Sequence, residues 1–262
     1  MKRFICILIL IIFLGFAYAR YFEPKRLKVN EYLITSNALP QSFDGLKIIH
    51  FSDVLYHNNN YSLLEKTIYE ILNSNADIVF FTGDLIKGDI NEEEKEQLIK
   101  HLNNIQPKLY KYAVLGDNDN EDVKQILEDS NFIVLDNTSA LLFNEGAEPI
   151  LIAGGDKLTN DSLLTEENIS YNYKIALTHF PDNFDNLKND YNLVLAGHSL
   201  GGEIRIPYLG AVLKKEGAQK YTDYHYQKDN NHLYVSFGLG TEKTNMRLFN
   251  MPSINIYRIY SK

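Results

Sequence analysis

The fold is decided by a strand ending, Leu193-Val194-Leu195-Ala196-Gly197-His198-Ser199-Leu200-Gly201-Gly202-Glu203, in which four apolar residues lead into a glycine-rich segment that carries a histidine. A short apolar run that stops abruptly at glycine is typical of a buried strand. In open α/β sheets, ligands bind just beyond the carboxyl ends of the strands. His198 therefore stands at a position where a site residue is expected.

Four further strand endings repeat this arrangement, because an apolar run leads each time into an aspartate or a histidine. They are Phe51-Ser52-Asp53, Thr82-Gly83-Asp84, Leu115-Gly116-Asp117-Asn118-Asp119 and Thr178-His179-Phe180-Pro181. A strand followed by Gly-Asp is, taken alone, most often a simple turn. Five such endings in order predict one shared site at the carboxyl edge of a sheet.

Apolar periodicity predicts helices and strands that alternate early in the chain, and mostly strands later. The predicted helices cover residues 63–72, 92–102 and 121–128. The predicted strands cover residues 32–35 (an edge strand), 46–51, 77–81, 111–115, 132–135, 140–143, 150–153, 174–178, 192–196, 233–237 and 253–260. This order favours an α/β fold, a four-layered sandwich of two mixed sheets flanked by helices.

Composition limits the classes of function. The 262 residues are 45% hydrophobic, which is enough for a full core, and we expect one domain over residues 21–262. The net charge of −8 argues against a nucleic-acid partner, because binding to the phosphate backbone depends on clustered Lys and Arg. The only cysteine, Cys6, excludes a disulfide framework and a thiolate metal site.

Residues 1–20 are predicted to be a signal anchor or a signal peptide. Lys2 and Arg3 precede an uncharged apolar run from Phe4 to Ala19. As a helix this run would be about 24 Å long, short of the ~30 Å hydrocarbon core but long for a signal-peptide core. Ala17-Tyr18-Ala19 fits a cleavage site, so secretion after cleavage behind Ala19 is the alternative to the retained single-pass anchor that we favour.

From about residue 29 to the C-terminus, the sequence resembles the calcineurin-like metallophosphoesterases, specifically their bacterial membrane-associated branch. The resemblance is carried by the five strand endings together with Leu39-Pro40, Asp44-Gly45-Leu46, Pro207-Tyr208-Leu209-Gly210 and Ser236-Phe237-Gly238-Leu239-Gly240-Thr241. It implies a phosphoester hydrolase with two divalent metal ions that share a bridging aspartate. It also favours a soluble domain on the extracytoplasmic side of the cell membrane.

The resemblance implies one well-preserved metal site and one degenerate site. Asp84 matches the bridging carboxylate, and Asp53 matches the aspartate of the first site, but Leu55 and Leu200 stand where that site has histidines. In the second site, His179 and His198 match the two imidazoles and Asp117 replaces an asparagine. Asn118 replaces a histidine that in many members protonates the leaving group or orients the phosphate.

We therefore expect Asp84, Asp117, His179 and His198 to hold one ion tightly, and a second ion near Asp53 to bind weakly or not at all. Two carboxylates and two imidazoles suit Zn²⁺, Mn²⁺ or Fe²⁺. Asp53, Asn118 and Asp119 are the candidate catalytic residues. With a single divalent ion, the ionised carboxylates of Asp53, Asp84 and Asp117 leave a net negative charge that repels phosphate, whereas two ions leave a net positive one.

The other histidines and two arginines have simpler interpretations. His57 could replace a missing first-site ligand, but a loop histidine is more often exposed. His50 is predicted to pack in the sheet, His225 and His232 to be exposed in a polar stretch, and His101 has no evident partner. Arg205 and Arg247 could contact a phosphate, although a lone arginine is more often a salt-bridge partner.

Two functions from different classes follow. The first is a membrane-associated, metal-dependent phosphoesterase, whose partners would be the membrane, through the N-terminal segment, and a phosphoester small molecule or lipid head group. The second is an inactive or weakly active member that keeps the fold as a metal-stabilised binding or scaffold module. Loss of both histidines from one site, Leu55 and Leu200, favours the second function, and the remaining chemistry favours the first.

Overall fold

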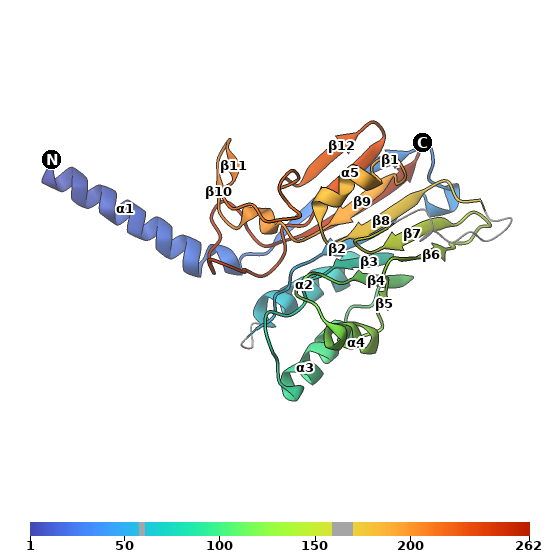
Figure 1. Cartoon of the computed structure of the whole chain (residues 1–262), viewed down its shortest axis with the longest axis horizontal. Coiled ribbons are helices and arrows are strands. Elements are labelled where there is room, and N and C mark those ends of the chain that lie inside the picture. The colour runs from blue at the N-terminus through green and yellow to red at the C-terminus, as the bar shows by residue number, and fades with distance from the viewer. Residues whose placement is uncertain (58–60, 159–169) are drawn as a thin grey trace.

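Two six-stranded mixed sheets lie face to face with helices outside them, which confirms the predicted four-layered α/β sandwich (Figure 1). The structure is a computed structural model that describes residues 1–57, 61–158 and 170–262. The chain order of the elements also follows the prediction, with strands and helices alternating early and strands dominating later.

The first sheet contains the N-terminal half of the domain and the last strand. Its order is β1-β14-β2-β3-β4-β5, in which β14 runs antiparallel to β2 and the other neighbouring pairs are parallel. The predicted edge strand over residues 32–35 is confirmed as part of β1. The bounds are β1 Lys28–Ser36, β2 Leu46–Phe51, β3 Ile78–Thr82, β4 Tyr110–Val114, β5 Ile133–Val134 and β14 Ser253–Ser261.

The second sheet has the order β12-β13-β9-β8-β7-β6. Its four central strands are parallel, and the two outer strands, β12 and β6, are antiparallel to their neighbours. The parallel strands are buried on both faces, so their sequences are continuous apolar runs and not alternating ones. The bounds are β6 Thr138–Leu142, β7 Ile150–Gly154, β8 Lys174–Thr178, β9 Leu193–Ala196, β12 His225–Lys228 and β13 Asn231–Val235.

Successive side chains of each strand point to opposite faces, and this builds three apolar layers. Ile48 and Phe80 lie in the core between the two sheets. Their neighbours Ile49 and Phe81 face the helices that cover the first sheet. These helices are α2 Tyr61–Ser74, α3 Glu92–Asn103 and α4 Glu121–Asp129, and the short α5 Phe184–Leu187 covers the second sheet.

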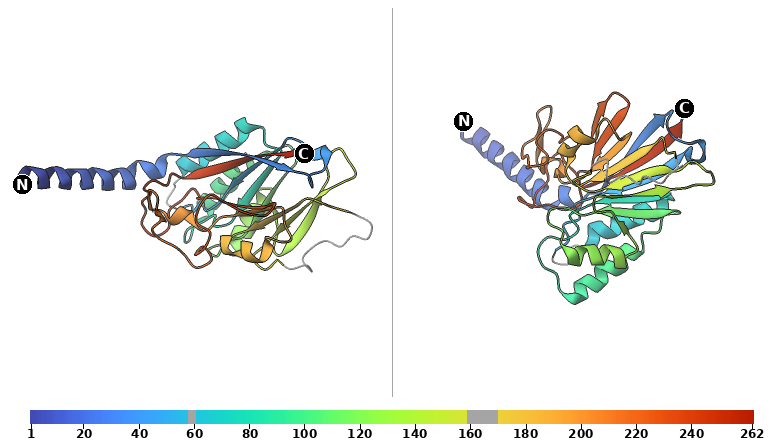
Figure 2. Two further views of the ribbon diagram at one scale, coloured as in Figure 1. Left: turned by 90° about the horizontal axis from the view of Figure 1, so that it is seen from above. Right: turned by 45° about the vertical axis from the view of Figure 1, so that its right-hand side comes forward.

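Several short elements were not predicted. They are α5, β12 and a hairpin formed by β10 (Arg205–Ile206) and β11 (Gly210–Ala211). Elements of two to four residues carry too few positions to show a period, and tertiary contacts determine them. The hairpin lies close to the end of the domain from which α1 projects (Figure 1; Figure 2).

Helix α1 (Lys2–Tyr21) extends away from the domain, and its C-terminal end is fixed to it (Figure 2). It is the one helix in the described part of the chain that is long and apolar enough to cross a membrane. The carbonyl of Ala19 accepts a hydrogen bond from the backbone N–H of Arg247 at 2.9 Å. The buried carboxylate of Glu23 accepts one from the backbone N–H of Asn250 at 2.5 Å.

Candidate metal centre

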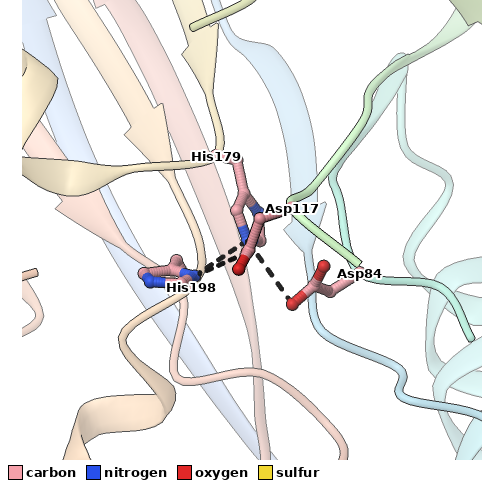
Figure 3. Close-up of side chains that lie close together, drawn as sticks. All are labelled: Asp84, Asp117, His179 and His198. Carbon is pink, nitrogen blue, oxygen red and sulfur yellow. Dashed lines mark hydrogen bonds and ion pairs between the residues drawn. The ribbon is translucent and has the colours of Figure 1, made fainter. Parts of the chain in front are cut away.

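Four side chains from four strand endings meet at one point between the two sheets (Figure 3). Asp84 follows β3, Asp117 follows β4, His179 follows β8 and His198 follows β9. One ligand atom from each residue lies within 4.8 Å of the others. The structure therefore brings together the four residues expected to hold one tight ion.

The two histidines and Asp117 make the closest contacts of this cluster. Asp117 Oδ1 lies 3.0 Å from His179 Nε2 and 3.1 Å from His198 Nδ1. The two ring nitrogens are 3.0 Å apart, and Asp84 Oδ2 lies 3.5 Å from His179 Nε2. Asp117 is half-exposed and the other three residues are buried, so the cluster opens to solvent on one side.

Backbone carbonyls fix the tautomer of each imidazole. His179 Nδ1 lies 2.7 Å from the carbonyl of Thr82, and His198 Nε2 lies 2.8 Å from the carbonyl of Glu216. A carbonyl only accepts hydrogen bonds, so these two nitrogens carry the protons. The opposite nitrogens, His179 Nε2 and His198 Nδ1, then face the same point, where they can bind a proton or a metal ion. Outer hydrogen bonds of this kind are typical of metal-binding histidines.

The electrostatics of the cluster favour a positive charge at that point. Complete burial acts to lower the pKa of His179, but the carboxylates of Asp117 and Asp84 outweigh it and raise this pKa well above its ordinary value. Hydrogen bonding to His179 and His198 lowers the pKa of Asp117. The cluster thus stabilises a cation between two ionised carboxylates, and its donor set fits a divalent transition-metal ion.

Asp53 lies beside this cluster at the end of β2 and is fully buried. Its Oδ2 accepts hydrogen bonds from the hydroxyl of Ser52 and, at 3.0 Å, from the backbone N–H of His198. Its Oδ1 is buried and has no hydrogen-bond partner within the described ranges. Burial raises the pKa of Asp53. A buried carboxylate oxygen without a partner is costly, and a cation would satisfy it.

Leu55 and Leu200 are the residues that, by the resemblance, stand where a first metal site would have histidines. Both side chains are fully buried and neither can ligate a metal. Both residues have left-handed backbone geometry, with φ of 47° and 48°. This region costs an ordinary residue roughly 1–2 kcal/mol, whereas Asn, Asp and His adopt it more often. The backbone at these two positions therefore has a conformation that suits polar residues better than leucine.

Asn118 and Asp119 both contact the strand ending that carries Asp84. The side-chain amide of Asn118 donates to Asp84 Oδ2 at 2.8 Å, and its backbone N–H donates to Oδ1 at 3.0 Å. The carboxylate of Asp119 accepts from the backbone N–H groups of Gly116, Asp84 and Leu85 at 2.8–2.9 Å. Asp119 thus connects the residues that follow β3 to those that follow β4, which favours a structural role. Asn118 orients the carboxylate of Asp84. Catalytic roles for the two residues stay predictions.

The structure shows the surroundings of two of the remaining histidines, His50 and His57. His50 is buried in the sheet against Thr82 Oγ1 (2.8 Å) and the Tyr257 hydroxyl (3.2 Å), and burial lowers its pKa to about 3. His57 Nδ1 lies 2.9 Å from the carbonyl of Leu55, and His57 is outside the four-residue cluster.

The polar-stretch histidines and the two arginines are not members of the four-residue cluster. His225 is exposed and His232 half-buried, and the two rings stack on each other. Arg205 forms the expected ion pair, with Asp223. For Arg247 the salt-bridge expectation is wrong: its fully buried guanidinium donates to the carbonyls of residues 237, 238, 240 and 250.

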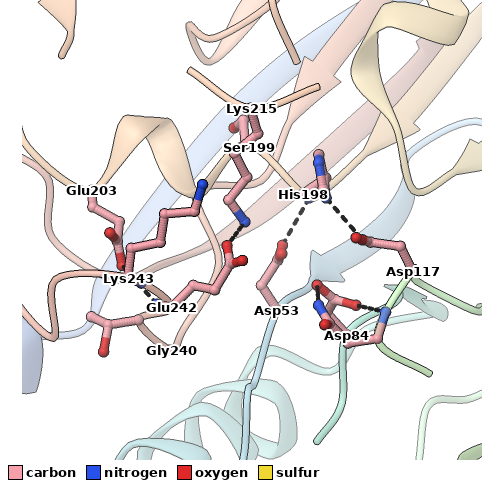
Figure 4. Close-up of polar contacts among 12 residues, drawn as sticks. Asp53, Asp84, Asp117, His198, Ser199, Glu203, Lys215, Gly240, Glu242 and Lys243 are labelled. Carbon is pink, nitrogen blue, oxygen red and sulfur yellow. Dashed lines mark hydrogen bonds and ion pairs between the residues drawn. The ribbon is translucent and has the colours of Figure 1, made fainter. Parts of the chain in front are cut away.

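A cavity of about 560 Å³ adjoins the cluster and contains lysines that the sequence analysis missed. Asp117 and His198 form part of its wall, together with Lys214, Lys215 and Lys243. Lys215 forms an ion pair with Glu242, and its side chain is only 12% exposed (Figure 4). Its charge acts to lower the pKa of Asp53, against the larger effect of burial. The sequence around Lys215 is polar and contains other lysines, so no pattern in it marks Lys215 as a site residue.

The chain is similar to several known proteins. The sequence model of the calcineurin-like phosphoesterase family matches residues 46–202. The uncharacterized metallophosphoesterase YkuE of Bacillus subtilis (strain 168) is 32% identical, over 94% of this chain and 90% of its own. The phosphodiesterase YaeI of Escherichia coli (strain K12) is 21% identical, over 87% and 86% of the two chains. Among solved structures, TT1561 of Thermus thermophilus aligns with a TM-score of 0.45 and 15% identity, over 74% and 90% of the two chains.

Proposed function

The chain belongs to the calcineurin-like phosphoesterase family, and we propose that it is a membrane-associated, metal-dependent hydrolase of phosphoesters. One Zn²⁺, Mn²⁺ or Fe²⁺ ion would be held by Asp84, Asp117, His179 and His198. The observation that carries this proposal is the pair of imidazoles whose tautomers are fixed so that both lone pairs meet two carboxylates. A relative that is named a phosphodiesterase supports the same class of reaction.

The residues around the proposed ion would have different roles in binding it. When bound, the divalent ion supplies Lewis-acid activation of the phosphoester and of water. The carbonyls of Thr82 and Glu216 hold the imidazoles in the tautomers that can ligate, and Asn118 holds the carboxylate of Asp84. Asp53 offers a buried, unpartnered oxygen beside this centre, where it would help to recruit a second ion.

The lysines of the cavity would offset the negative charge that a single ion leaves. The carboxylates of Asp53, Asp84 and Asp117 outnumber the charges of one divalent ion by one. Lys215 is the most relevant cation, because it is largely buried, lines the cavity with Asp117 and acts electrostatically on Asp53. Its ammonium group, which pairs with Glu242 in the structure, would take part of the role of the missing ion by exchanging that partner for the phosphate group of the substrate.

We predict that Lys215→Met lowers kcat/KM for an aryl phosphodiester by about 10- to 100-fold, mostly through KM. Hydrogen bonds to a charged group contribute roughly 1.5–3 kcal/mol, which corresponds to that range. Steady-state kinetics and the metal content of the same preparation check it, and the metal content should not change. Lys220→Met, at a lysine that pairs with Asp185, is the matched control. Kinetics equal to those of the native protein would exclude this role of Lys215.

The scaffold alternative is favoured by one observation. Both histidine positions of the first site carry buried leucines, Leu55 and Leu200, which leave Asp53 as its remaining dedicated side chain beside the bridging Asp84. A metal-loaded preparation that turns over no phosphomonoester or phosphodiester, at any concentration of Mn²⁺ or Zn²⁺, would support this alternative. Measurable turnover that disappears with chelator would support the hydrolase.

We predict that the mature protein retains Met1 to Ala19 and fractionates with membranes. Cleavage after Ala19 would remove the carbonyl that accepts the hydrogen bond from the backbone N–H of Arg247. It would also remove the buried side chain of Ala19 from the domain. Intact-mass measurement of the mature protein checks this prediction. A mature N-terminus at Arg20 would contradict it. Protease added to intact cells should digest the domain, because we place the domain on the extracytoplasmic side.

A further inference from the structure

The β10–β11 hairpin exposes a group of large apolar side chains, which we call the apolar hairpin. Tyr208 and Leu209, at its tip, are 108% and 80% exposed. The other members, all exposed, are Ile206, Val212, Leu213 and Phe249 of an adjacent loop. Single exposed apolar residues are ordinary on protein surfaces, but a contiguous group marks an interaction surface.

Hydrogen bonds connect the apolar hairpin to the end of α1. The backbone N–H of Arg205 donates to the carbonyl of Leu248 at 2.9 Å, which joins the hairpin to the loop of Phe249. The preceding residue of that loop, Arg247, donates to Ala19 of α1. In both views the hairpin lies at the end of the domain from which α1 emerges (Figure 1; Figure 2).

The end of α1 has the composition of a membrane–water interface. Tyr21 and Phe22 are exposed, and the exposed Arg20, Lys25 and Arg26 adjoin them. Tyrosine is enriched where one part of a side chain is in lipid and another in water, and basic residues attract anionic lipid head groups. Since Arg247 bonds to Ala19 and the next residue, Leu248, bonds to the hairpin, this segment and the apolar hairpin lie at the same end of the domain, so one lipid surface can contact both.

We propose that the apolar hairpin inserts into the outer part of the same bilayer that α1 crosses, and that the substrate is a phosphoester carried by a lipid. The second statement rests on the proposed function, whereas the first does not. Lys214 and Lys215 directly follow Leu213 and line the cavity beside the metal centre. Insertion of the hairpin would therefore place the cavity at the level of the lipid phosphates. A lipid would reach the cavity with its acyl chains along the apolar hairpin.

The absence of tryptophan from the sequence allows a direct test of insertion. The full chain with Leu209→Trp is reconstituted into vesicles of phosphatidylcholine and phosphatidylglycerol that contain lipids brominated at defined depths. We expect blue-shifted emission and at least twofold quenching by shallow brominated lipids. Phe143→Trp is the matched control, because Phe143 is also exposed and follows β6 at the other end of the domain. Its emission should stay red-shifted and unquenched.

Two outcomes would overturn the insertion. Equal, weak quenching of both variants would mean that the hairpin stays in water. A blue shift without quenching, which grows with the number of chains per vesicle, would mean that a second copy of the chain covers the hairpin. Both substitutions replace exposed side chains, so neither test depends on repacking the core.

Turnover tests the substrate class separately from insertion. Leu209→Asp should lower turnover of a phospholipid in vesicles at least tenfold relative to turnover of a soluble aryl phosphodiester. An unchanged ratio would overturn the lipid substrate, even if the hairpin inserts. If neither compound is hydrolysed by the metal-loaded native protein, the proposed hydrolase fails, and the quenching experiment still decides whether the hairpin inserts.

Discussion

Replacing His198 with alanine should abolish tight metal binding, because the cluster then loses one of its two lone-pair nitrogens. We expect about one transition-metal ion per native chain and close to none in the variant. The loss in affinity should exceed the 10- to 100-fold typical of outer-shell partners, since His198 would ligate the ion directly. Asp53→Ala should keep most of the metal, because Asp53 lies outside the group of four converging ligand atoms.

Elemental analysis of the full chain, purified without chelator, measures this difference. His225→Ala is the matched control, because His225 is an exposed imidazole that stacks on His232 away from the cluster. Equal loss of metal in the His198 and Asp53 variants would show that the ligand assignment is wrong. Two tightly held ions in the native chain would show that the first site is intact in spite of its leucines.

The second large effect is expected from restoring the first site. Leu55→His with Leu200→His should add a second ion and raise phosphoesterase activity by about 100-fold or more, since two ions can stabilise both the attacking and the leaving oxygen. The left-handed backbone at both positions accepts histidine more readily than leucine. Each substitution alone should change little, because the first site would still lack one imidazole.

The control for this experiment is Leu55→Phe with Leu200→Phe, which places a ring at the same buried positions without adding a ligand. Thermal unfolding with and without Mn²⁺ separates a poorly folded variant from one that does not bind the ion. If the native protein already hydrolyses an aryl phosphodiester as fast as the double histidine variant, the first site is not what limits catalysis. If the variant binds two ions and stays inert, Asn118 or the cavity accounts for the missing activity.

Much of the fold could be predicted because its central strands are buried on both faces. Such strands are continuous apolar runs, and their abrupt ends at Asp53, Asp84 or His198 mark the edge of the sheet. β12 could not be predicted, because only four residues in a polar stretch form it and its pairing with β13 depends on a partner strand. The β10–β11 hairpin could not be predicted either, because each of its strands has only two residues.

The sequence predicted which four side chains meet at the candidate site, but not the groups that support them. Aspartate and histidine at strand ends have a sequence signature. The carbonyls of Thr82 and Glu216, which fix the imidazole tautomers, have none, because every residue carries a carbonyl. Lys215 was missed for another reason. It reaches the cavity from a stretch with no periodicity, and its ion pair with Glu242 joins residues distant in sequence.

The buried Arg247 connects α1 to the strand ending that carries Asp53. Its backbone N–H holds Ala19 of α1, and its guanidinium holds the carbonyl of Gly240 at 2.6 Å. The N–H of Gly240 in turn donates to the carbonyl of Asp53 at 2.7 Å. These bonds are short and sheltered from water, so they are stiff. A force that tilts or pulls the helix would therefore act on the loop behind Asp53 through these hydrogen bonds, in addition to its direct path along the backbone into β1.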